Sequence, residues 1–151
     1  MPALTYATPE QPRWMQSLIA LIEYSLGRRH LERVYDNVIA ATDRGESYWR
    51  AALQELEACP SFQDNAFAQI PKNGPVIFIA NHPFGILDGL TLCHLAECSR
   101  GPFHILINAA LCREPRLEPY FMPVDFSNTK RATFTNARSA RKVIKNLKEG
   151  G

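Results

Sequence analysis

A short apolar run that ends in polar and backbone-disrupting residues constrains this chain more than any other feature. Residues 75–80 read PVIFIA, too short for a helix and typical of a strand buried on both faces of a sheet. Asn81 and His82 follow directly, Gly85 then disrupts the backbone, and a helical pattern begins at about Ile86. In open parallel sheets, ligands bind at the carboxyl ends of strands, so this turn is where chemistry is expected.

The remaining pattern predicts an α/β fold in which an N-terminal helical layer precedes strand–helix units of a mostly parallel sheet. The length of 151 residues suits one domain with one core. Residues 1–11 are expected to form a loose arm, and residues 12–60 to form helices. In the rest of the chain we expect strands at 75–80, 103–107 and 121–126 and helices at about 86–98 and 131–148.

Two helical segments carry charge or aromatic patterns with more than one interpretation. Residues 130–148 contain seven bases and no acid, which suits phosphate or an anionic membrane surface but also a solvated helix face. The helix expected at 12–26 has Trp14 and Tyr24 flanking its apolar stretch, with arginines beyond them. Such a helix fits a membrane interface, and it also fits packing against a protein core.

The cysteines and the N-terminus restrict the classes of protein further. The four cysteines lack the two close pairs of a structural zinc site, so reduced thiols in a cytosolic protein are expected, and no metal. The first residues lack the basic and apolar regions of a signal peptide, and no apolar run is long enough for a membrane span.

His82 and Asp88 suggest general-base catalysis. They are six residues apart and cannot share a helix face, but Gly85 allows a tight return that brings them together. Asp88 would then hold one imidazole nitrogen, and the other would take a proton from an attacking hydroxyl or amine. Asn81 and the backbone N–H groups near Gly85 could orient the loop or stabilise an oxyanion. The alternative is a structural histidine at a strand end.

Residues 80–89, ANHPFGILDG, resemble the first motif of the glycerolipid (lysophospholipid) acyltransferase superfamily. They are most similar to the His-Pro-x-Gly form of the hemolysin-like and ornithine-lipid-type branch, which has five residues between His and Asp. The resemblance implies a glycerol-3-phosphate acyltransferase-like fold, with His82 as general base and Asp88 as its partner. It also implies an acyl thioester of coenzyme A or acyl carrier protein as co-substrate, with no other cofactor. The acceptor would be a lysophospholipid, a glycerol phosphate or an amino-lipid.

The resemblance covers roughly residues 70–151, and within it Lys130 and Arg131 are candidates, by position, for holding an acceptor phosphate. A later Phe-Pro-x-Gly block is absent, so residues 61–151 are expected to be the first part of an acyltransferase domain whose C-terminal part is missing. The expected location is cytoplasmic, peripheral on the inner face of the cell membrane, with no nucleic-acid partner. The alternative is a non-catalytic lipid- or membrane-binding module. A hydrolase or nucleotide-binding enzyme is disfavoured because the chain has no nucleophile elbow and no Gly-rich phosphate loop after the first strand.

Overall fold

The chain divides into two compact units, Met1–Cys59 and Pro60–Gly151. A computed structural model describes residues 10–25, 27–62, 65, 67–81 and 83–150. In this part of the chain, five α-helices accompany two short parallel strands, and the helices of the first unit precede both strands. The α/β class predicted from the sequence is therefore confirmed.

The first unit contains α1 (Arg13–Ser25), α2 (Arg28–Asp43) and α3 (Tyr48–Glu55). Ser47 begins α3 as predicted, because its side-chain oxygen accepts the backbone N–H of Arg50 at 3.3 Å. The core of the unit comes from the facing sides of α2 and α3, which bury Val38, Ala41, Trp49, Ala51, Ala52 and Leu53.

Helix α1 exposes the apolar face that the sequence predicted. Trp14 is 65% exposed and Leu21 is 64% exposed, so the residues that the structure describes leave most of this face uncovered. At the other end of α1, Glu23 is buried and forms an ion pair with Arg28 at 2.8 Å, which fixes the turn into α2. None of the helices in the described residues is both long and apolar enough to cross a membrane.

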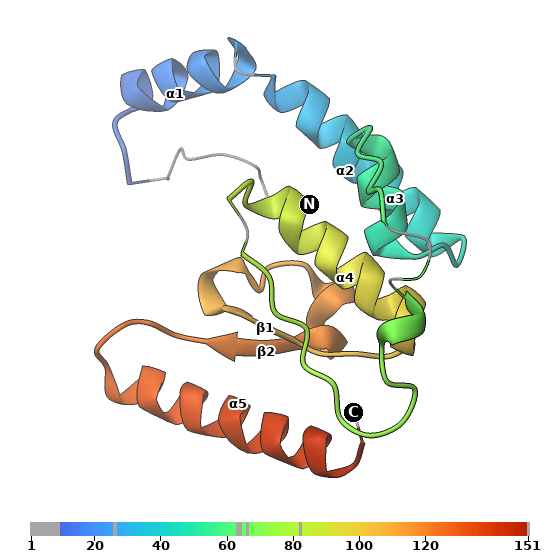
Figure 1. Cartoon of the computed structure of the whole chain (residues 1–151). Coiled ribbons are helices and arrows are strands. Elements are labelled where there is room, and N and C mark those ends of the chain that lie inside the picture. The colour runs from blue at the N-terminus through green and yellow to red at the C-terminus, as the bar shows by residue number, and fades with distance from the viewer. Residues whose placement is uncertain (1–9, 26, 63–64, 66, 82, 151) are drawn as a thin grey trace. The chain divides into compact units, whose positions relative to one another are not determined.

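The second unit contains α4 (Ile86–Arg100), β1 (Ile105–Asn108), β2 (Phe121–Val124) and α5 (Lys130–Lys148), with two short 3-10 helices between the strands. The strands pair in parallel, with Ile105 opposite Phe121. Figure 1 shows α4 on one side of this small sheet and α5 on the other. Apolar residues of α4 and β2, among them Leu90, Cys93 and Met122, are buried.

The prediction of a strand at residues 75–80 is wrong. The segment is extended, but it joins no sheet, and β1 pairs only with β2 within the described residues. Its side chains alternate, with Val76 and Phe78 half-buried, whereas Ile77 is 66% exposed and Ile79 is 87% exposed. Among the residues that the structure describes, no neighbouring strand completes its hydrogen bonds or covers its other side, so the apolar run buries one face rather than two.

Side-chain hydrogen bonds tie α5 to β2 and to the turn between them. The Asn136 amide accepts the backbone N–H of Asp125 and donates to the carbonyl of the same residue, both at 2.8 Å. One helical turn further on, the Ser139 hydroxyl donates to the Pro123 carbonyl at 2.6 Å. Thr129 begins the helix, since its side-chain oxygen accepts the backbone N–H of Ala132 at 3.1 Å.

Candidate functional site

The turn before α4 holds the Asp88 carboxylate in place. Gly85 precedes the helix with φ 62° and ψ −114°, a conformation that favours glycine. The chain turns back there, so the backbone N–H of Phe84 donates to Asp88 Oδ2 at 2.8 Å. Asp88 lies in the first helical turn, where a negative side chain also interacts favourably with the helix dipole. The turn that the sequence predicted around Gly85 therefore forms, and it fixes one oxygen of the carboxylate.

The other oxygen, Asp88 Oδ1, receives no hydrogen bond from any residue that the structure describes. His82 lies outside the described residues, so its pairing with this oxygen stays a prediction. Asn81 is exposed just before it. A carboxylate with one fixed and one available oxygen can orient an imidazole and stabilise its protonated form, as general-base catalysis requires.

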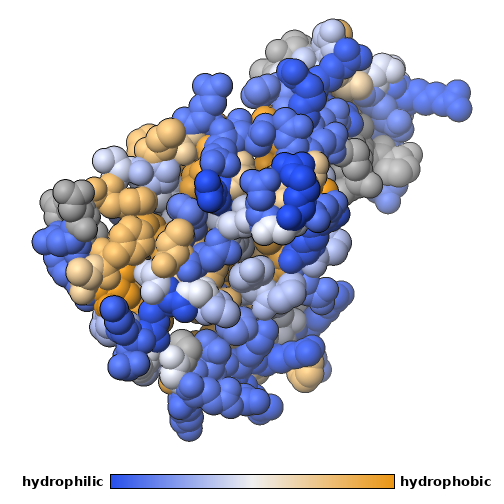
Figure 2. Space-filling view, turned by 90° about the vertical axis from the view of Figure 1, so that its right-hand side faces the viewer, coloured by the Kyte–Doolittle hydropathy of each residue, from blue (hydrophilic) through white to orange (hydrophobic). Residues whose placement is uncertain are grey.

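Three apolar side chains that are close to this turn in the sequence are exposed. Ile79, Phe84 and Ile86 are all largely exposed. On the one face of the molecule that Figure 2 draws, apolar side chains gather in one region of the surface. An exposed apolar patch of this kind is typical of a surface that contacts lipid or another protein.

Lys130 and Arg131, the predicted phosphate-binding residues, lie in the first turn of α5 and are exposed. Hydrogen bonds from Ser127 lower the pKa of the Asp125 carboxylate, and the charge of Arg131 makes a smaller contribution in the same direction. Neither residue lines the clefts described below, so their proposed role rests on sequence position.

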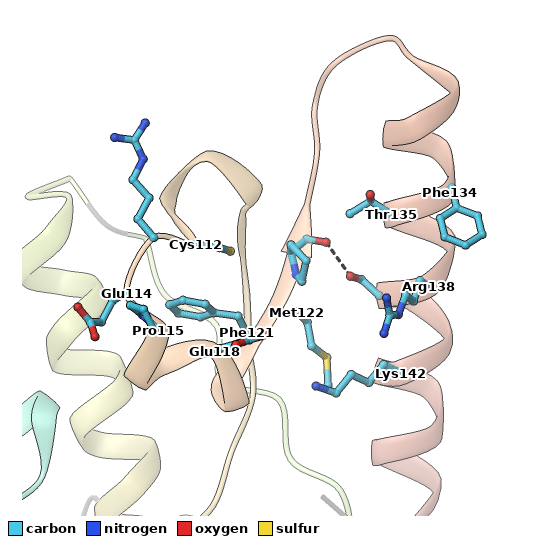
Figure 3. Close-up of a pocket in the computed structure, with 13 residues that line it drawn as sticks. Cys112, Glu114, Pro115, Glu118, Phe121, Met122, Phe134, Thr135, Arg138 and Lys142 are labelled. Atoms are coloured by element: carbon cyan, nitrogen blue, oxygen red, sulfur yellow. Dashed lines mark hydrogen bonds between the residues drawn. The ribbon is translucent and has the colours of Figure 1, made fainter. Parts of the chain in front are cut away.

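A cleft of about 580 Å³ opens between β2, α5 and the segment that leads from β1 to β2 (Figure 3). Its lining includes the cations Arg138 and Lys142 on α5 and the apolar residues Phe121 and Met122 on β2. Cys112 also lines it, and burial raises the pKa of that thiol. The sequence shows the bases of α5 only as charges spread along one helix, and it does not distinguish the two that line this cleft.

A second cavity, of about 330 Å³, lies between the extended segment 76–78, α4, β1 and α5. Arg100, at the end of α4, is one of the residues that line this cavity. Its guanidinium donates to the carbonyls of Pro71, Gly74 and Gly150, the latter two at 2.6 and 3.3 Å. These three acceptors are far from Arg100 in the sequence, so no local pattern could have revealed the contact.

Two of the cysteines, Cys93 and Cys98, lie on α4, the helix that follows the turn. Burial, with a smaller contribution from Glu97, raises the pKa of Cys93 to about 12, so this thiol stays protonated at neutral pH. Cys98 contacts His94 one turn earlier on α4. The described residues contain no cluster of three or more His, Cys, Asp or Glu residues suited to a metal ion.

Comparison with known proteins decides the family. The family model described as Acyltransferase matches residues 63–151, a stretch that contains the turn and all of the sheet. The chain belongs to the acyltransferase family. The superfamily predicted from residues 80–89 is thus confirmed, and the finer assignment to one branch stays a prediction.

The chain is also similar to a curated acyltransferase. A lyso-glycine lipid O-acyltransferase of Phocaeicola vulgatus is 31% identical over 91 residues. The match covers 56% of this chain and 33% of the relative, so the chain spans about a third of the relative's length. No solved structure matches the chain.

Proposed function

We propose that this chain is part of an enzyme that transfers a fatty acyl group from an acyl thioester to a lipid acceptor. The observation that carries the proposal is the position of Asp88 in an acyltransferase family member. Its carboxylate is fixed by the Phe84 N–H at the start of α4, six residues after His82.

In the proposed reaction, His82 and Asp88 act as a pair. The free imidazole nitrogen of His82 removes the proton from the acceptor hydroxyl or amine as that atom attacks the thioester carbonyl. The carbon–sulfur bond then breaks, and the leaving thiolate takes the proton from the imidazolium, which restores the base. Asn81 and the backbone N–H groups near Gly85 would stabilise the oxyanion that forms on the carbonyl oxygen.

The co-substrate would be acyl coenzyme A or acyl carrier protein, with no other cofactor. The name of the similar Phocaeicola vulgatus enzyme favours an amino-lipid acceptor over a lysophospholipid or a glycerol phosphate. For an acceptor that carries a phosphate, Lys130 and Arg131 are the proposed contacts at the start of α5.

We also propose that the protein lies on the inner face of the cell membrane, held there without spanning it. The exposed apolar face of α1 and the bases of α5 support this location. Sedimentation with vesicles is the test. More protein should sediment with anionic than with neutral vesicles, and salt should reduce the difference because exposed charges are screened over about 8 Å at physiological ionic strength. Equal sedimentation with both, unchanged by salt, would argue against the proposed location.

A non-catalytic lipid-binding module is the second candidate, and the exposed Phe84 and Ile86 beside the turn favour it. A transfer assay with the intact protein separates the two. Acyl-CoA and acyl carrier protein thioesters would each be offered with lyso-glycine lipid, lysophospholipid and glycerol phosphate. Acylated product from any pair supports the enzyme, whereas lipid binding without product from all pairs supports the module.

A further inference from the structure

The carboxyl ends of both strands and the starts of α4 and α5 lie toward one end of the second unit (Figure 1). Helix α5 begins there, because only a short turn separates it from the end of β2. Helix α4 begins there too, since its last residue, Arg100, is hydrogen-bonded to Gly74 and Gly150 at the opposite end, where α5 finishes. The turn that fixes Asp88 therefore lies at the carboxyl end of the sheet.

Four large apolar side chains are exposed at this end, and they come from three separate segments of the chain. Phe84 and Ile86 lie in the turn before α4 and at its first position. Leu111 ends the short 3-10 helix that follows β1, and Phe126 lies in the turn that follows β2. All four are between 64% and 78% exposed. Side chains of this size lose free energy when they leave water, so this end is suited to contact with an apolar phase.

The charges at the same end favour an anionic partner. Lys130 and Arg131, in the first turn of α5, are exposed. Asp88 and Asp125 are half-buried, and each accepts a backbone N–H, at 2.8 and 2.9 Å respectively. Glu114, in the segment after β1, is half-buried in an ion pair. Exposed apolar side chains beside exposed cations match the interface of an anionic bilayer, where the apolar groups enter the acyl chains and the cations meet the headgroups.

We propose that the carboxyl end of the sheet is a surface of this chain that enters the bilayer interface. The four apolar side chains lie among the lipid acyl chains, and the two cations of α5 lie at anionic headgroups. The proposal rests on the membrane location proposed above, and it names the surface that makes the contact. The turn at Asp88 then faces the bilayer, so a lipid acceptor reaches it while the alkyl chains of the acceptor stay among other lipids.

Partition of the intact protein into vesicles of anionic phospholipid tests this surface. Leu111→Ser and Phe126→Ser should each weaken partition about tenfold or more, because each removes a large apolar side chain from the acyl region. Ile144→Ser is the matched control. Ile144 is also exposed, but it lies beside Lys145 and Lys148 toward the other end of α5, so its loss should change partition less than about twofold. All three variants should unfold near the wild-type temperature, since the replaced side chains are exposed.

Two tryptophan variants give a second measurement that does not remove apolar area. The wild-type chain has only Trp14 and Trp49, both outside the second unit, and their quenching by brominated lipids sets the background. Phe126→Trp should add quenching above this background, because the new indole lies among the acyl chains. Ile144→Trp should add none.

Equal losses in the three serine variants, or added quenching at both tryptophan positions, would overturn the proposal in favour of binding along α5. Vesicle binding that persists unchanged in Leu111→Ser and Phe126→Ser would reject this surface and leave the membrane location in place. Self-association without vesicles that Phe126→Ser abolishes would instead assign this end to a second copy of the chain. Acyl transfer to a detergent-dispersed acceptor reports on the reaction separately, so product without any vesicle binding would reject the surface and not the enzyme.

Discussion

Replacing Asn136 with alanine should loosen α5 from the end of β2. The Asn136 side chain makes two hydrogen bonds to the backbone of Asp125, each 2.8 Å long and partly buried. A typical hydrogen bond contributes about 0.5–1.5 kcal/mol, so losing both should lower the free energy of unfolding by about 1–3 kcal/mol. For a chain of this length, a loss of about 2 kcal/mol lowers Tm by roughly 4–8 °C.

Thermal unfolding followed by circular dichroism would measure this loss. Asn128→Ala is the matched control, because Asn128 is exposed in the turn before α5 and should change stability by less than about 0.5 kcal/mol. Asn136→Asp keeps the size and the acceptor but places a carboxylate against the Asp125 carbonyl, so it should not restore stability. If Asn136→Ala unfolds at the same temperature as Asn128→Ala, the reasoning about this contact is wrong.

Three further perturbations test other parts of the second unit. Arg100→Ala removes three hydrogen bonds to backbone carbonyls and should lower the free energy of unfolding by about 2 kcal/mol or more, measured in urea; an unchanged midpoint would contradict this. Cys93, with its pKa raised to about 12, should be about 1 part in 10⁴ thiolate at pH 8, so a thiol reagent should modify the exposed Cys98 far faster; equal rates would contradict the burial of Cys93. Burial, and to a smaller extent the charge of Lys142, lowers the pKa of His104. The neutral His104 side chain therefore contributes to the free energy of unfolding above about pH 6.5, and this contribution is lost as the pH falls. His104→Gln should lose less stability below that pH, and an unchanged dependence of stability on pH would exclude His104 as the cause.

The helices were predictable from the sequence because their signals are local. Ser47 and Thr129 begin α3 and α5 through their own side chains, and Gly85 breaks the chain just before α4. Each of these signals acts within a few residues, so the printed sequence contains all the information needed. The same holds for the hydrogen bond from the Phe84 N–H to Asp88, which spans four residues.

The segment 75–80 shows where such reasoning fails. Its composition predicts a buried strand, but a strand forms only when a neighbour satisfies its hydrogen bonds, and the described residues provide none. The sequence alone could not predict which bases of α5 line a cleft, for a similar reason. Their number is evident from the sequence, but only the packing of α5 against β2 distinguishes Arg138 and Lys142 from the rest.

The rate of acyl transfer in the intact protein and its variants tests the central claim most directly. His82→Ala should lower the rate about 10²–10⁴-fold, the usual contribution of a general base, and Asp88→Asn should lower it less but still by more than about tenfold. His94→Ala removes an imidazole from α4 away from the turn and should leave the rate unchanged. A His82→Ala protein that transfers acyl groups at the wild-type rate would contradict the account.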